Sequence, residues 1–347
     1  RSTMAFTFRG FYSSSPRGIL RVFSSSASSS SASSSSSSVT KVPLFLNGSF
    51  QDSTTSSWIP VTNPATNEVI SQVPMCTPQE FEDAVAGAKE AAATWRHVPV
   101  SARQRVMLKL QQLINENKDE LAKSISLEQG KTISDAHGDV FRGLEIVEQA
   151  CAAGWLSEGH CVHNVARGVD TMAIREPLGV TAGICPFNFP AMVPLWMFPL
   201  AAATGNSMVL KPSEKDPGAT MMLAEMATEA GLPPGVLQVV HGAHDVVNAI
   251  CDHPTIKAVS FVGGDAAGKH IYSRACANGK RAQVNMGAKN HAVVLPDADP
   301  EATAKALAGA AFGAAGQRCM AIGVIVTVTG GDMGVRDRLA GKLAPPG

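Results

Sequence analysis

The sequence predicts an α/β chain whose central part, residues 178–286, forms a doubly wound, Rossmann-like parallel sheet. Short apolar segments typical of buried strands alternate there with longer segments that have helical periodicity. Strands are expected at residues 179–185, 207–210, 235–240, 257–262 and 281–286. Helices are expected between them at residues 190–205, 217–231, 244–253 and 266–279. This alternation gives right-handed crossovers with helices on both faces, so a ligand is expected beyond the carboxyl ends of the strands.

The segments on either side of this sheet are expected to form further parts. Residues 41–158 begin with short strands and continue as the helical N-terminal part of the same domain. Helices are predicted where apolar residues recur every three or four positions, at residues 78–95, 101–125 and 139–155. Residues 159–177 alternate loosely and predict an exposed hairpin. Residues 287–347 open a further α/β domain with a strand at 291–299 and a helix at 300–317.

Composition favours a small-molecule ligand. The chain has 347 residues, 45% of them hydrophobic, which is enough for more than one domain. Its 29 basic and 29 acidic residues balance, so no charge signal indicates a nucleic acid or an anionic membrane as partner. The seven cysteines are scattered and form no C-x-x-C pair, which predicts reduced intracellular thiols and no metal site.

The first 40 residues differ from the rest of the chain. They contain four arginines and seventeen serines, and no acidic residue occurs before Asp52. Arginines spaced through apolar residues are typical of a mitochondrial transit peptide, although a disordered serine-rich tail is the alternative. Residues 1–40 are therefore interpreted as a disordered transit peptide that directs the chain to the mitochondrial matrix.

One uncharged stretch, residues 177–210, is long enough to cross a bilayer. Five prolines fall inside it, and they make one uninterrupted apolar helix improbable. A buried strand, a loop and a helix explain the stretch better, so no membrane span is expected.

Cys319 is the first candidate for chemistry, within "GAAGQRCMA" at 313–321. A cysteine among small residues is usually an inert core residue. Here a small-residue helix is expected to end at Gly316, and the polar turn after it can present the thiol to a cleft. A thiol in that position is a strong nucleophile.

Three further stretches offer groups that could hold a reacting oxygen or a nucleotide. Asn188 in "PFNFP" is either a turn asparagine or an amide donor aimed at an oxyanion. Lys211 and Glu214 in "LKPSE" fit ordinary helix-start chemistry, but Lys211 ends a parallel strand, where a ribose hydroxyl would arrive. "FVGGDAAG" at 261–268 is a glycine turn before a helix, suited to a phosphate or merely to a turn.

Taken together and in this order, "PFNFP", "LKPSE", "FVGGDAAG" and "GQRC" resemble the aldehyde dehydrogenase superfamily over residues 42–322. The resemblance implies that Cys319 is the nucleophile and that Asn188 forms an oxyanion hole with the Cys319 backbone N–H. It implies an NAD-binding domain in which the cofactor contacts come from Phe187, Lys211, Glu214, Gly263, Gly264 and Gly268. It also implies that the hairpin at 159–177 serves to form a homo-oligomer.

One difference from the superfamily pattern indicates which group of its members the chain resembles. Most members carry a glutamate, the general base, where this chain has Asn285 in "NMGAK". Asparagine cannot accept a proton from water, so hydrolysis of a thioester would lack its base. "VNMGAKNH" and "AAGQRCMA" resemble the CoA-acylating methylmalonate-semialdehyde dehydrogenases. That resemblance implies NAD-dependent oxidation of methylmalonate or malonate semialdehyde, with acyl transfer to CoA that yields propionyl-CoA or acetyl-CoA.

The substrates of that group carry a carboxylate, for which a cationic fork is the natural receptor. Arg318 is the first candidate and Arg142 the second, with a surface ion pair as the alternative for Arg142.

Two other functions stay open. One is a hydrolytic aldehyde dehydrogenase, and the other is an inactive fragment that binds NAD. The match is expected to fade after Ile322, which would leave residues 287–347 as a truncated catalytic domain in which a strand at 323–330 has an unpaired edge.

Overall fold

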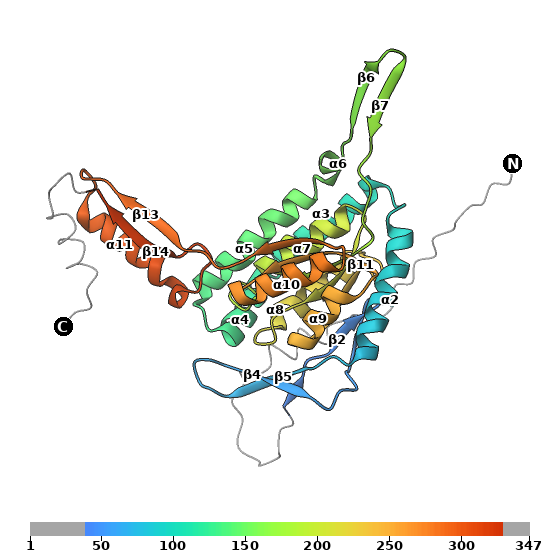
Figure 1. Ribbon diagram of the computed structural model, residues 1–347. Helices are drawn as coiled ribbons and strands as arrows, with labels where there is room; N and C mark the ends of the chain where they lie inside the picture. The colour runs from blue at the N-terminus through green and yellow to red at the C-terminus, as the bar shows by residue number, and fades with distance from the viewer. Residues whose placement is uncertain (1–38, 329–347) are drawn as a thin grey trace. The chain divides into compact units, whose positions relative to one another are not determined.

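The computed structural model describes residues 39–328, shown in Figure 1. The transit peptide predicted for residues 1–40 lies outside the described residues except for its last two positions. Residues 329–347, the last part of the predicted truncated domain, also lie outside them.

A seven-stranded sheet confirms the predicted fold class. Its order is β12-β11-β8-β9-β10-β2-β3, and the five strands from β12 to β10 are parallel. These five are β8 (Val180–Ile184), β9 (Ser207–Lys211), β10 (Leu237–Val239), β11 (Ile256–Val262) and β12 (Arg281–Asn285). Counted along the chain from β8, they lie in the order 3-2-1-4-5, so the direction of winding reverses between β8 and β11. That reversal is where a doubly wound sheet binds its ligand.

Two antiparallel strands extend the sheet beyond what the sequence predicted. β2 (Leu44–Leu46) pairs with β10, and β3 (Ser49–Gln51) pairs with β2. The sheet is therefore mixed rather than purely parallel. The predicted short strands in this region exist, but their pairing with the central sheet was missed.

Helices cover both faces of the sheet, as predicted. On one face, α2, α9 and α10 share a buried core with Val180, Ala182 and Ile184 of β8. On the other face α7 contacts β8 and β9, and α8 contacts β10. The bounds of these helices are α2 (Pro78–Trp95), α7 (Met192–Ala203), α8 (Gly218–Glu229), α9 (His244–Asp252) and α10 (Asp265–Ala277).

The remaining helices differ from the prediction in two places. The helix predicted at 101–125 is two helices, α3 (Val100–Glu116) and α4 (Lys118–Gln129), which meet at Asn117. α5 (Ile133–Ala150) begins six residues before the predicted start, because the Thr132 hydroxyl caps it by accepting a hydrogen bond from the Asp135 N–H. A short helix, α6 (Ala153–Leu156), follows.

Three smaller sheets of the described residues lie outside the central one, and two of them come before β8 in the sequence. β1 (Thr40–Lys41), β5 (Val69–Pro74) and β4 (Trp58–Thr62) form a three-stranded sheet. β6 (His160–Ala166) and β7 (Val169–Ala173), green in Figure 1, form the predicted antiparallel hairpin, and every residue in both strands is exposed.

The last described part is a β-α-β unit. β13 (Asn290–Val294) leads to α11 (Pro300–Phe312) and a 3₁₀ turn η1 (Gly313–Gly316), and β14 (Ile322–Thr327) follows. β14 pairs in parallel with β13. α11 carries the chain back to place β14 beside β13, and among the described residues the other edge of β14 has no partner strand, as expected. The predicted helix also ends earlier, at Phe312, since Gly313–Gly316 form η1.

No helix between residues 39 and 328 is both long enough and apolar enough to cross a membrane. The uncharged stretch at 177–210 contains β8, α7 and most of β9.

Candidate functional site

All of the predicted site residues except Gly268 and Arg142 line one cavity at the carboxyl ends of β8 and β11. The cavity has a volume of about 1080 Å³ and is bordered by the loops after β8, β9, β11 and β12 and by the turn before β14. Its wall includes Phe187, Asn188, Lys211, Glu214, Gly263, Gly264, Arg318 and Cys319. Residues more than 130 positions apart in sequence thus reach one place, at the winding reversal expected to bind a ligand.

Cys319 lies exposed in the turn between η1 and β14. The two alanines of η1, Ala314 and Ala315, have φ values of 52° and 54°, a left-handed conformation that few non-glycine residues adopt. Asn290 fixes the other side of the turn, because its Nδ2 donates to the carbonyl oxygens of Cys319 at 2.9 Å and Ala321 at 3.0 Å. The thiol is therefore held at the cavity rather than packed in a core, as the predicted role requires.

Asn188 approaches the same turn from the loop after β8. Its side-chain Nδ2 donates to the Gln317 carbonyl at 2.6 Å, two residues before the cysteine. Its own backbone carbonyl accepts from Lys131 Nζ at 2.7 Å. The structure thus brings the predicted amide donor beside the turn that carries Cys319.

Lys211 ends β9 and points along the cavity edge. Its buried Nζ donates to the carbonyl oxygens of Pro212 at 2.8 Å and Gly242 at 2.9 Å. The Glu214 carboxylate lies 3.3 Å from the same Nζ. Both predicted residues therefore face one edge of the cavity, with carboxylate oxygens available to accept from hydroxyl groups of a ligand.

The glycines of "FVGGDAAG" serve different purposes. A Cβ at Gly263 would lie 2.4 Å from the Phe261 ring, whereas a Cβ at Gly264 would meet nothing within 4 Å. Gly264 precedes α10 and leaves open space at the helix N-terminus, which suits an anion. Gly268 is not on the cavity wall. It lets α10 lie close to the end of β12, because a Cβ at position 268 would lie 2.3 Å from Met286 Cγ.

The two arginines proposed for substrate binding separate in the structure. Arg318 lines the cavity, and its Nη2 pairs with Asp135 Oδ1 at 2.7 Å. Arg142 lies on the exposed side of α5, paired with Glu145 at 2.9 Å, and it does not line the cavity. The role of Arg142 stays a prediction.

Asn285 is the last residue of β12, on the strand next to β11. Its backbone carbonyl accepts from the Gly263 N–H at 3.1 Å and so ties the glycine turn to β12. The residue that replaces the superfamily's base therefore lies at the carboxyl edge of the sheet, directly before the cavity residues Met286 and Gly287.

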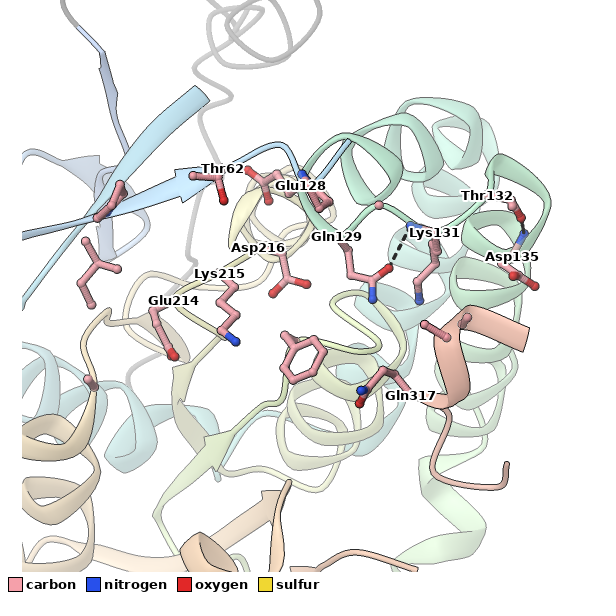
Figure 2. A pocket seen from close by; sticks show the side chains of 18 residues that line it. Thr62, Glu128, Gln129, Lys131, Thr132, Asp135, Glu214, Lys215, Asp216 and Gln317 are labelled. Carbon is pink, nitrogen blue, oxygen red and sulfur yellow. Dashed lines mark hydrogen bonds between the residues drawn. The ribbon is translucent and has the colours of Figure 1, made fainter. Parts of the chain in front are cut away.

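A second cavity of about 910 Å³ shares Phe187, Glu214 and Gln317 with the first. Glu128 and Asp216, both labelled in Figure 2, belong to its wall, and both side chains are buried. Burial raises the pKa of Glu128 to about 8, although the Gly218 N–H donates to its Oε2 at 2.8 Å. Burial also raises the pKa of Asp216 well above its ordinary value, and a nearby Ser213 hydroxyl offsets only part of that effect.

Three groups of polar residues that surround the site were not predicted from the sequence. They are the buried acids of the second cavity, Lys131 behind Asn188, and Asn290 beside Cys319. Each follows or adjoins a turn in the sequence, but only the folded chain brings it to its partner. A charged residue in an apolar environment would have indicated such a site, but the environment of a side chain is known only from the folded structure.

The sequence profile of the aldehyde dehydrogenase family matches residues 50–342, so the match continues past Ile322, where it was expected to fade. The mitochondrial acylating methylmalonate-semialdehyde dehydrogenase of Arabidopsis thaliana is 62% identical over 83% of this chain and 47% of its own length.

Two crystal structures resemble the chain with a TM-score of 0.85 and 44% identity, over 88% of this chain and 62% of each of theirs. One is the methylmalonate-semialdehyde dehydrogenase of Oceanimonas doudoroffii. The other, from Sinorhizobium meliloti 1021, is assigned to the same enzyme and is complexed with NAD. The chain spans about half the length of the curated relatives it matches. By sequence profile, relatives and fold alike, the chain belongs to the aldehyde dehydrogenase family.

Proposed function

We propose that the chain oxidises methylmalonate or malonate semialdehyde with NAD and transfers the acyl group to CoA through a thioester on Cys319. The observation that carries the proposal is the meeting of the Cys319 turn, Asn188 and the Lys211–Glu214 edge in one cavity. The acylating names of the relatives and Asn285 at the position of the missing base support CoA as the acceptor.

The residues of the cavity fit a dinucleotide. Lys211 and Glu214 would hold a ribose, and the open space at Gly264 before α10 would accept a phosphate. When bound, NAD supplies the acceptor for the hydride that leaves the aldehyde carbon.

Cys319 performs the covalent part of the proposed reaction. Its sulfur adds to the aldehyde carbon, and the oxygen that becomes negative accepts hydrogen bonds from Asn188 Nδ2 and the Cys319 N–H. Loss of hydride then leaves a thioester, and the aldehyde carbon is oxidised by two electrons. The CoA thiolate attacks this carbon, and the Cys319 sulfur departs as the leaving group. Formation of propionyl-CoA or acetyl-CoA also requires that the substrate carboxylate leave as CO2, so that its C–C bond breaks and the carbon left behind takes up a proton. For water to attack instead, a base would be required, which Asn285 cannot supply.

Arg318 is the proposed receptor for the substrate carboxylate. Its partner Asp135 and Arg318 itself are each about one-third exposed, so a substrate carboxylate can replace Asp135 at small cost. Arg142 remains the second candidate.

The assembly and location of the protein are also proposals. The exposed hairpin at 159–177 carries the apolar residues Val162, Val165 and Met172, which are 50%, 54% and 72% exposed. Such a surface favours a homo-oligomer. The relatives are named mitochondrial, which supports location in the mitochondrial matrix.

The dependence on CoA tests the proposed function. Without CoA, purified chain given NAD and malonate semialdehyde should release at most one NADH per chain and carry an acyl group on Cys319, measured by mass spectrometry. With CoA, NADH should form continuously. Cys319→Ala should form no adduct, whereas Cys276→Ala, at another exposed cysteine, should behave as wild type. Equal rates with and without CoA would indicate a hydrolytic enzyme, and NAD binding without an adduct would indicate a binding fragment.

A carboxylate at position 285 should restore hydrolysis. General bases contribute about 10²–10⁴ to rates, and an added one without supporting contacts should give at least about a tenfold increase in acid release without CoA. Asn285→Glu would be compared with Asn285→Gln, which adds the same length but no base. If both variants release acid at the wild-type rate, the lack of a base does not explain the choice of acceptor.

A further inference from the structure

A buried ion pair lies directly behind the loop that carries Asn188. Lys131 Nζ and Asp139 Oδ2 are 2.9 Å apart, and their side chains are 2% and 0% exposed. Lys131 follows α4, and Asp139 belongs to α5. Removing two charges from water is costly, and replacing such a pair by apolar residues is often neutral or stabilising. Stability alone therefore does not account for this pair.

The pair contacts the Asn188 loop at two places, in its middle and at the start of α7. Lys131 Nζ donates to the Asn188 carbonyl at 2.7 Å and lies 4.4 Å from the centre of the Phe189 ring. Asp139 Oδ1 accepts from the Met192 N–H, the first of α7, at 2.7 Å. Positions 188, 189 and 192 are thus fixed by two side chains that also bind each other.

These contacts determine where the Asn188 amide points. The carbonyl that Lys131 holds belongs to the same residue whose Nδ2 reaches Gln317 beside Cys319. A shift of the Asn188 backbone would move this amide away from the position of the reacting oxygen. Misplacement by about 1 Å can cost about 10²-fold in rate.

We propose that the Lys131–Asp139 pair is a positioning device that holds Asn188 at the oxyanion position. The proposal rests on the proposed function, in which Asn188 donates to the oxyanion. Lys131 and Asp139 touch neither the aldehyde nor the cofactor and act only through the loop.

A double-mutant cycle separates this role from a purely structural one. Lys131→Met should slow the first NADH release at saturating NAD by about 10–100-fold. In an Asn188→Ala background the same change should slow it less than about twofold, because the amide to be positioned is gone. Effects that multiply in full would overturn the proposal. Lys123→Met, at an exposed lysine of α4, serves as the control and should leave the rate unchanged.

A second variant shows whether a slow NADH release is caused by misfolding. Lys131→Met leaves the Asp139 charge buried without its partner, whereas Lys131→Met combined with Asp139→Leu removes both charges. The double replacement should retain the wild-type melting temperature within a few degrees and still show the slow NADH release. Wild-type rates in a folded double variant would contradict the proposal.

Hydrogen exchange tests the positioning without turnover. In the double variant, amide exchange should accelerate in a peptide spanning residues 186–192, where the Met192 N–H loses its acceptor. Peptides from β11 should be unchanged. If the wild-type chain oxidises no aldehyde, the proposed function fails, and exchange still decides whether the pair holds the loop. Unaltered exchange at 186–192 would refute that holding role.

Discussion

Replacing Asn188 by alanine is expected to lower the rate of the first NADH release by about 10²–10³-fold, the usual effect of losing one oxyanion donor. The structure places the Asn188 amide beside the Cys319 turn, where its Nδ2 now donates to the Gln317 carbonyl at 2.6 Å. During the reaction this donor would turn to the new oxyanion, which is charged and therefore a stronger acceptor. Single-turnover kinetics with malonate semialdehyde measures the effect.

Two comparisons make the expected result specific to the donor. Asn188→Asp keeps the shape but replaces the amide with a carboxylate that repels an oxyanion, so it should be at least as slow as Asn188→Ala. Alkylation of Cys319 by iodoacetamide forms no oxyanion and should proceed within about twofold of the wild-type rate in both variants. If Asn188→Ala gives a wild-type first release of NADH, Asn188 is not the donor.

The parallel sheet could be predicted because its signals are local. β8 and β9 are buried along their whole length, and each appears in the sequence as a short, mostly apolar segment. The sequence therefore located Lys211 and Asn188 at strand ends, and the sheet's topology brought them together. α2 was predicted at its observed bounds from apolar residues that recur every three or four positions, and a capping box of Thr77 and Glu80 marks its start in the structure.

Contacts between distant segments could not be predicted in the same way. β2 joins the sheet through β10, nearly 200 residues later, and its three residues carry no signal for that partner. Arg318 pairs with Asp135, which lies 183 positions earlier in the sequence, so no local sequence pattern indicates this ion pair. Resemblance to a family supplied the role of Cys319, because the residues around it alone favour an inert thiol.

The buried acids of the second cavity give the other large effect, on stability. Glu128 has a pKa of about 8 in the folded chain against an ordinary value of 4.5. The folded chain therefore keeps this proton between pH 4.5 and 8, where the unfolded chain loses it, so stability falls as the pH rises through that window. Above about pH 8 both states are ionised, and the contribution of Glu128 becomes constant.

Glu128→Gln should remove this loss, because glutamine is neutral at every pH and its amide oxygen can still accept from the Gly218 N–H. At about 1.4 kcal/mol for each pH unit above the ordinary pKa, the variant should gain about 3 kcal/mol in the free energy of unfolding at pH 7 and almost nothing at pH 4. Denaturant unfolding at the two pH values measures this difference. Glu90→Gln, at an exposed position of α2, should change stability by less than about 0.5 kcal/mol at both. A gain in Glu128→Gln of equal size at pH 4 and pH 7 would show that packing, and not the cost of a buried charge, separates the variant from the wild type.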